Sequence, residues 1–160
     1  MAGIQVAILM GSKSDAPIME EARKMLKDFG ISCDMRVLSA HRTPKETAEY
    51  AETFRSKGGK IFICGAGVSA ALAGVVAAHT TLPVIGVPID AGLDGLDALL
   101  STVQMPPGVP VAAVAIGRPG AKNAALLAIR ILSLSDPSLE KKLDQFREEQ
   151  RQNILNTDLS

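Results

Sequence analysis

The sequence has little aromatic character and no net charge. Tryptophan is absent, and only one Tyr and four Phe occur in 160 residues. Proteins that hold single-stranded nucleic acid stack its bases on aromatic side chains, so a platform of that kind is excluded. Lys plus Arg and Asp plus Glu each number 17, and the chain therefore lacks the broadly basic surface that binds nucleic acids and anionic membranes. We expect neither of these partners.

Cysteine is scarce as well. Cys33 and Cys64 are the only two, and they form no C-x-x-C or Cys/His pattern of a metal site. The first fifteen residues lack the basic region, apolar stretch and cleavage site of a signal peptide. These features predict a cytoplasmic protein with two free thiols and no metal.

Small residues are abundant instead, with 22 Ala and 14 Gly. Residues 61–89 carry no charged side chain, but Gly and Pro divide this run into short elements, which argues against a membrane span. Only three residues between 65 and 117 are charged, whereas ten of the last 26 are. We expect the middle of the chain to be buried, within the fold and against other subunits, and the end to be an exposed arm or one between subunits.

Apolar runs alternate with segments of helical periodicity. The alternation predicts one α/β domain over residues 1–160, a flavodoxin-like three-layer αβα sandwich with a five-stranded parallel sheet of order 2-1-3-4-5 and a C-terminal helix. The predicted strands are Ile4–Met10, Cys33–Leu38, Lys60–Cys64, Pro83–Val87 and Val109–Ile116. The predicted helices are Ala16–Phe29, Pro44–Ser56, Ser69–Ala78, Gly95–Thr102, Asn123–Leu134 and 137–156, the last with Leu139, Leu143, Phe146 and Ile154 on one face.

Ligands of such folds bind beyond the carboxyl ends of the strands, so the loops after the first three strands are the candidates. In the first loop, Gly11 allows a ligand to approach the backbone. The hydroxyls of Ser12 and Ser14 stand at a helix start, which favours phosphate, and Asp15 suits a ribose hydroxyl. The same residues also fit an ordinary N-cap, and that alternative stays open.

The second loop contains Ser39, His41 and Arg42. Arg42 offers a bidentate contact to phosphate. Histidine gives and takes protons near neutral pH, so His41 is the candidate acid–base group. Residues 43–46 (TPKE) fit a capping box with Pro at the first helical position. A surface His and Arg before a capped helix is the alternative interpretation.

The third loop begins Gly65-Ala66-Gly67 and matches G-x-G-x-x-A. It follows the third strand and not the first, and the only acidic candidate downstream, Asp90, lies beyond the next strand, so a nicotinamide or flavin site is not favoured. We expect Gly65, Ala66 and Gly67 to line the same pocket with free N–H groups.

Four segments closely resemble the 5-(carboxyamino)imidazole ribonucleotide mutase family of purine biosynthesis, over Val6 to about Leu134. They are MGSKSD (10–15), SAHRTP (39–44), VQMPPGVPV (103–111) and KNAALLA (122–128). The resemblance implies an isomerase that moves the substrate's carboxylate from the exocyclic nitrogen to the ring carbon, giving 4-carboxy-5-aminoimidazole ribonucleotide. It also implies a homo-octamer with active sites at subunit contacts, and no metal or organic cofactor.

Carried over residue by residue, Ser12, Asp15 and Arg42 match the family's nucleotide-binding positions, and His41 matches its catalytic histidine. The chain departs from the family in two places: Ala71 stands where A-A-H-L-P-G has His, and the Ile89–Gly95 loop is one residue shorter and has no Ser. Two alternatives therefore stay open, an aminoimidazole ribonucleotide carboxylase that uses carbon dioxide directly and a non-catalytic nucleotide-binding relative.

Overall fold

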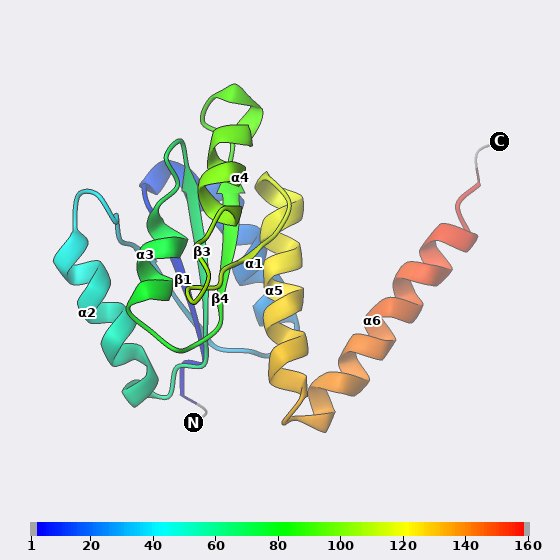
Figure 1. The fold of residues 1–160 in the computed structure, drawn as a ribbon. Helices are drawn as coiled ribbons and strands as arrows, with labels where there is room; N and C mark the ends of the chain where they lie inside the picture. The colour runs from blue at the N-terminus through cyan, green and yellow to red at the C-terminus, as the bar shows by residue number, and fades with distance from the viewer. Residues whose placement is uncertain (1–2, 159–160) are drawn as a thin grey trace.

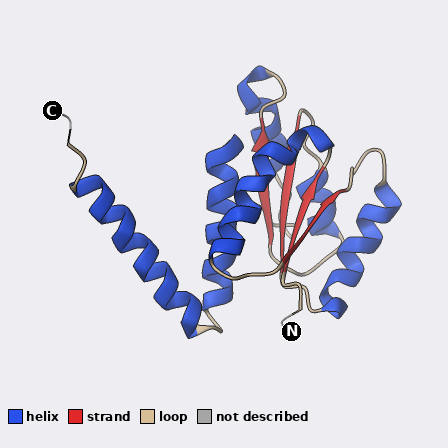
Figure 2. Ribbon diagram, turned by 180° about the vertical axis from the view of Figure 1, so that it is seen from behind, coloured by secondary structure: helices blue, strands red, loops and turns tan. Residues whose placement is uncertain are grey.

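The computed structural model describes residues 3–158, and its centre is a parallel sheet (Figures 1 and 2). The sheet has five strands in the order β2-β1-β3-β4-β5, which confirms the order predicted from the sequence. The strands are β1 (Val6–Met10), β2 (Cys33–Val37), β3 (Ile61–Gly67), β4 (Val84–Ile89) and β5 (Ala112–Ala113).

Helices cover both faces of this sheet and complete the three-layer α/β sandwich (Figure 1). They are α1 (Ala16–Asp28), α2 (Pro44–Phe54), α3 (Leu72–Ala78), α4 (Leu96–Val103), α5 (Gly117–Ser133) and α6 (Pro137–Leu155). Three single turns of 3-10 helix, Lys13–Asp15, Arg55–Lys57 and Leu93–Gly95, adjoin them.

The side chains of β1 show how one strand serves both layers. Val6, Ile8 and Met10 belong to the apolar cluster that α1 and α5 complete, whereas Ala7 and Leu9 belong to the cluster with α2 and α3. All five are at most 2% exposed. Alternate residues of a strand point to opposite faces, so a strand buried on both faces must be apolar throughout.

Glycine in the sheet lets a helix approach closely. A Cβ on Gly86 of β4 would lie 2.3 Å from Cγ2 of Thr102 in α4, and Thr102 is 2% exposed. Gly86, one of the many glycines of this chain, therefore allows a helix to pack closely against the sheet.

Several predicted boundaries were wrong. Strand β3 continues beyond Cys64, because residues 65–67 pair with Val87, Pro88 and Ile89 of β4. Helix α3 begins at Leu72, three residues after the predicted start. Strand β5 has two residues instead of the predicted eight, and α5 begins at Gly117, well before the predicted Asn123. The remaining strands and helices agree with the predictions to within two residues at most ends.

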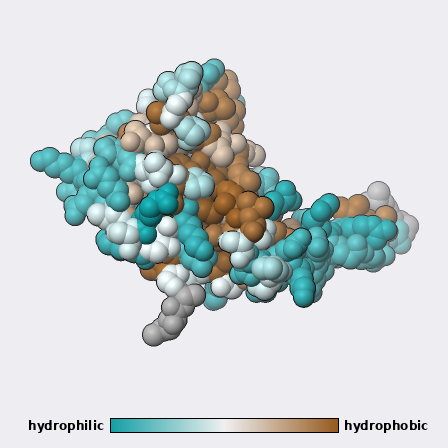
Figure 3. Space-filling model, turned by 60° about the horizontal axis from the view of Figure 1, so that its bottom comes forward, coloured by the Kyte–Doolittle hydropathy of each residue, from teal (hydrophilic) through white to brown (hydrophobic). Residues whose placement is uncertain are grey.

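Helix α6 forms an arm that leaves the body of the molecule (Figure 1). Its first turns are anchored, since Leu139 and Leu143 are buried and the Lys142 ammonium donates a 2.8 Å hydrogen bond to the Phe29 carbonyl. Farther along, Ile154 and Leu155 are 77% and 63% exposed. Figure 3 shows hydrophobic surface both beside the base of the arm and near its outer end.

Candidate active site

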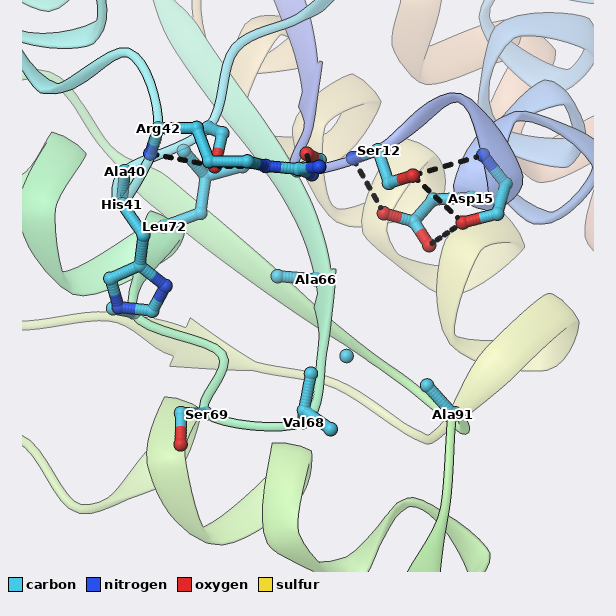
Figure 4. A pocket seen from close by; sticks show the side chains of 15 residues that line it. Ser12, Asp15, Ala40, His41, Arg42, Ala66, Val68, Ser69, Leu72 and Ala91 are labelled. Atoms are coloured by element: carbon cyan, nitrogen blue, oxygen red, sulfur yellow. Dashed lines mark hydrogen bonds between the residues drawn. The ribbon is translucent and has the colours of Figure 1, made fainter.

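Loops after four strands enclose a cavity of about 620 Å³ at the carboxyl edge of the sheet (Figure 4). Volumes of about 300–1,000 Å³ are typical of small-molecule sites. Nine of the ten predicted site residues line it: Gly11, Ser12, Ser14, Asp15, Ser39, His41, Arg42, Ala66 and Gly67.

The tenth residue, Gly65, does not line the cavity. It lies within β3, and a Cβ there would meet the sulfur of Met19 at 2.3 Å. Its carbonyl accepts a 3.2 Å hydrogen bond from the Gly11 N–H. Gly65 therefore joins β3 to the start of the first loop and leaves room for α1.

The first loop is organised by Asp15. One carboxylate oxygen accepts a 3.0 Å hydrogen bond from the Ser12 N–H, and Ser12 and Ser14 are joined by a 2.9 Å bond between their hydroxyls. Asp15 is only 8% exposed. Burial raises the pKa of this carboxyl above its usual value, while the hydrogen bonds from Ser12 and Ser14 and the charge of Arg42 act in the opposite direction.

Arg42 connects the second loop to the first. Its Nη2 donates a 2.6 Å hydrogen bond to the Gly11 carbonyl, and its Nε lies 3.4 Å from the Ser39 hydroxyl oxygen. The guanidinium therefore lies at the beginning of the first loop, beside Ser12 (Figure 4). A planar cation in this place, next to hydroxyls and a helix start, suits a phosphate.

The predicted capping box at residues 43–46 is wrong. Pro44 occupies the first helical turn as expected, but Thr43 makes no side-chain cap bond to α2. The Thr43 hydroxyl instead donates to the Ser39 carbonyl at 3.1 Å and accepts from the Ser39 N–H at 2.9 Å. The hydroxyl closes the loop that carries His41.

His41 is exposed at the tip of that loop. In Figure 4 its imidazole ring leaves the loop in a different direction from Arg42, on the side of the cavity where Ser69 lies. Within residues 3–158 the ring has no hydrogen-bond partner. Both ring nitrogens are therefore available to a ligand in the cavity.

The opposite wall is mostly apolar. The sequence predicted that the third loop lines the pocket and marked Ala71, but it did not single out the other residues of this wall. Val68 is held in the left-handed backbone region with φ of 50°, although a β-branched residue rarely adopts it. Ala71, where the family pattern has His, also lines the cavity. The sequence feature that could have identified these residues as pocket lining is their position in the loops that follow the strands. The lining residues that are not among the ten predicted site residues are Ala40, Val68, Ser69, Ala71, Leu72 and Ala91.

The described part of the chain contains no group of three or more His, Cys, Asp or Glu side chains placed to hold a metal ion. No helix among residues 3–158 combines the length and apolar character needed to cross a membrane.

Comparison with known proteins places this site in a family. The model of the AIR carboxylase family matches residues 5–153. The chain belongs to the AIR carboxylase family. An N5-carboxyaminoimidazole ribonucleotide mutase of Pyrococcus abyssi is 55% identical over 148 residues, covering 92% of this chain and 84% of that protein. Another from Saccharolobus solfataricus is 54% identical, covering 97% of this chain and 98% of that protein.

Among solved structures, the crystal structure of Treponema denticola PurE superposes with a TM-score of 0.86. It is 35% identical, and the match covers 94% of each chain. The resemblance of the loop motifs to this family, inferred from the sequence, is therefore confirmed.

Proposed function

We propose that this AIR carboxylase family member is an N5-carboxyaminoimidazole ribonucleotide mutase of purine biosynthesis. Its reaction moves a carboxylate from the exocyclic nitrogen of the substrate to the neighbouring ring carbon, giving 4-carboxy-5-aminoimidazole ribonucleotide. The observation that carries the residue roles is that His41 and Arg42, on the loop after β2, face the same cavity as the Ser12–Asp15 loop. The similarity to curated mutases over nearly the whole chain supports the reaction.

The phosphate and ribose of the substrate are bound by the first two loops. Arg42 and the Ser12 and Ser14 hydroxyls contact the phosphate, and the Asp15 carboxylate accepts a hydrogen bond from a ribose hydroxyl. Gly11 and Ser39 complete this side, while Ala66 and Gly67 form the floor. Binding the ribose phosphate at one end fixes the orientation of the imidazole at the other, so binding energy is used for positioning.

His41 carries the proton. Protonating the exocyclic nitrogen releases carbon dioxide and leaves an electron-rich aminoimidazole. The ring carbon then attacks the carbon dioxide, and a proton leaves that carbon. One group that first gives and then takes a proton is sufficient, and imidazole does both near neutral pH. The cavity must exclude water well enough for carbon dioxide to react before it escapes.

The protein functions as a cytoplasmic homo-oligomer, an octamer of single-domain subunits. Two exposed apolar surfaces support association. Leu96, Leu100 and Val103 lie on one side of α4 and are 54%, 48% and 49% exposed. The outer end of α6 carries Ile154 and Leu155, and this arm packs between subunits. Large exposed apolar patches are typical of protein interfaces.

The deciding experiment follows the conversion of the carbamate substrate by ultraviolet absorbance, without ATP, in wild type and His41→Asn. We expect the variant to lose turnover by about 10²–10⁴-fold while it stays folded and still binds nucleotide. His79→Asn is the matched control, because His79 contacts Glu52 at 2.9 Å and does not line the cavity. Near-normal turnover in His41→Asn would contradict the role of His41.

The same assay separates the alternatives. Arg42 and Pro44 match the mutase pattern, whereas the segment Ser69–Leu72 looks a little like the carboxylases that use carbon dioxide directly. In addition, Ala71 lines the cavity where the family pattern has histidine. Aminoimidazole ribonucleotide with bicarbonate is therefore supplied in parallel. Faster turnover of that mixture than of the carbamate would favour a direct carboxylase, and nucleotide binding without turnover of either would favour a non-catalytic protein.

A further inference from the structure

The loop that carries His41 is closed by its own first and last residues. Five hydrogen bonds join Ser39 to Arg42 and Thr43 at the end of the loop, and Thr43 takes part in three of them. We propose that Thr43 is a positioning residue, whose hydroxyl holds the loop backbone so that His41 projects into the cavity. This inference rests on the proposed function, in which His41 moves the proton.

The closure depends on one hydroxyl that both accepts and donates. The Thr43 Oγ1 accepts from the Ser39 N–H at 2.9 Å and donates to the Ser39 carbonyl at 3.1 Å. The Thr43 N–H donates to that same carbonyl at 2.8 Å. In addition, the Arg42 N–H donates to the Ser39 hydroxyl at 3.2 Å. The Arg42 Nε also donates to that hydroxyl, at 3.4 Å. Two of the five bonds disappear if the Thr43 hydroxyl is removed.

Both ends of the loop are anchored in the fold. The Leu38 N–H, just before the loop, donates to the Met10 carbonyl at 2.9 Å. Just after it, the Thr43 carbonyl accepts from both the N–H and the hydroxyl of Thr47, which is fully buried. Because these anchors do not depend on the Thr43 hydroxyl, its loss should loosen the tip of the loop and leave α2 and β2 in place.

The two functional side chains at the tip differ in how they are held. Arg42 has its own bonds, from the guanidinium to the Gly11 carbonyl and to Ser39. His41 has no side-chain hydrogen bond within the described residues, so its position depends on the backbone alone. Loosening the loop should therefore displace His41 more than Arg42, and should affect the chemical step more than nucleotide binding.

The experiment compares Thr43→Val, which keeps the shape and removes the hydroxyl, with Thr43→Ser, which keeps the hydroxyl. We expect Thr43→Val to lower kcat by about 10–100-fold, because a displacement of about 1 Å has an effect of that size. Its KM should stay within about threefold of wild type, since uniform binding by Arg42 is retained. Thr43→Ser should restore kcat to near the wild-type value.

Thr53→Val is the matched control. Thr53 lies in the same helix, α2, and its hydroxyl donates to the Glu49 carbonyl at 2.8 Å, far along the helix from the cavity. This variant should keep wild-type kcat and KM. Equal losses of kcat in Thr43→Val and Thr53→Val, or in Thr43→Val and Thr43→Ser, would overturn the proposal.

A second measurement reports on His41 without any turnover. The chain has only two histidines, so NMR spectra of protein labelled at the histidine Cε1 contain one ring signal from His41 and one from His79. In Thr43→Val the His41 signal should shift or broaden, while the His79 signal stays unchanged. An unchanged His41 signal would overturn the proposal. Failure of the mutase assignment would instead appear as no turnover of the carbamate by the wild-type protein, and failure of the His41 role as normal turnover in His41→Asn, with the NMR result unaffected in both cases.

Discussion

Arg42 and Gly11, 31 positions apart in the sequence, are joined by a 2.6 Å hydrogen bond from the guanidinium to the backbone carbonyl. The bond can form because β1 and β2 are parallel neighbours with Met10 aligned to Val37. The loops that follow the two strands therefore begin side by side at the same edge of the sheet. One end of Arg42 thus ties together the two loops that bind the nucleotide in the proposed function.

Replacing Arg42 with Ala should raise KM for the carbamate substrate by roughly 10–100-fold, because hydrogen bonds to a charged group contribute about 1.5–3 kcal/mol. Arg42→Lys keeps the positive charge but lacks the planar guanidinium that can contact two phosphate oxygens at once. Its KM should therefore lie between those of wild type and Arg42→Ala. Arg130→Ala is the control, since this exposed arginine lies on α5 and does not line the cavity. Steady-state kinetics decide, and an unchanged KM in Arg42→Ala would exclude the phosphate contact.

Replacing Asp15 with Asn should abolish most activity without lowering stability at neutral pH. Burial raises the pKa of the Asp15 carboxyl above its ordinary 3.8, so the folded protein binds this proton more tightly than the unfolded chain does. The resulting contribution to stability is present below about pH 3.8 and is lost as pH rises through the folded-state pKa. Asn keeps an oxygen to accept the Ser12 N–H.

The melting temperatures of wild type and Asp15→Asn between pH 4 and pH 7 test this. The melting temperature of Asp15→Asn should increase relative to that of wild type as the pH rises. The difference between them should level off once the wild-type carboxyl is ionised. A difference that shrinks with rising pH would mean that the folded protein prefers the ionised carboxyl.

Replacing Val68 with Gly should raise stability slightly. Left-handed backbone costs a non-glycine residue about 1–2 kcal/mol, and Val68 has φ of 50°. Gly also makes the unfolded chain more flexible, which reduces the stability gained from the relieved backbone by about 0.4–1 kcal/mol. Val103→Gly is the control, because Val103 is similarly exposed but helical, and that variant should be less stable. Urea unfolding measures both, and a destabilised Val68→Gly would show that the strain is not released.

Replacing Gly120 with Ala should be strongly destabilising, although Ala favours helices. A Cβ there would lie 1.6 Å from the Ala115 carbonyl oxygen, which belongs to the backbone and has no freedom to rotate away. Overpacking of this kind costs about 3 kcal/mol. Gly3→Ala is the control, because its nearest neighbour would be 4.0 Å away. The midpoint of urea unfolding should fall for Gly120→Ala alone.

Much of the fold was readable from local pattern. The continuous apolar run 6–10 forms a strand buried on both faces, as predicted. Helix α1 ends at Asp28, just before Gly30 adopts a positive φ. Boundaries failed where tertiary pairing overrode local signals: residues 65–67 look like a glycine loop, yet they extend β3 because β4 offers them hydrogen-bond partners. Gly65 was misplaced for the same reason.

The sequence by itself determined which chemical groups meet at the site, because parallel strands deliver their following loops to one edge of the sheet. This rule alone predicts that Ser12, Asp15, His41 and Arg42 lie together. Only the tertiary structure decided how they are held: the Thr43 hydroxyl turns back to Ser39 rather than capping its helix, Arg42 reaches Gly11, and Asp15 is buried. These depend on distances between loops far apart in the sequence, and no local propensity encodes them.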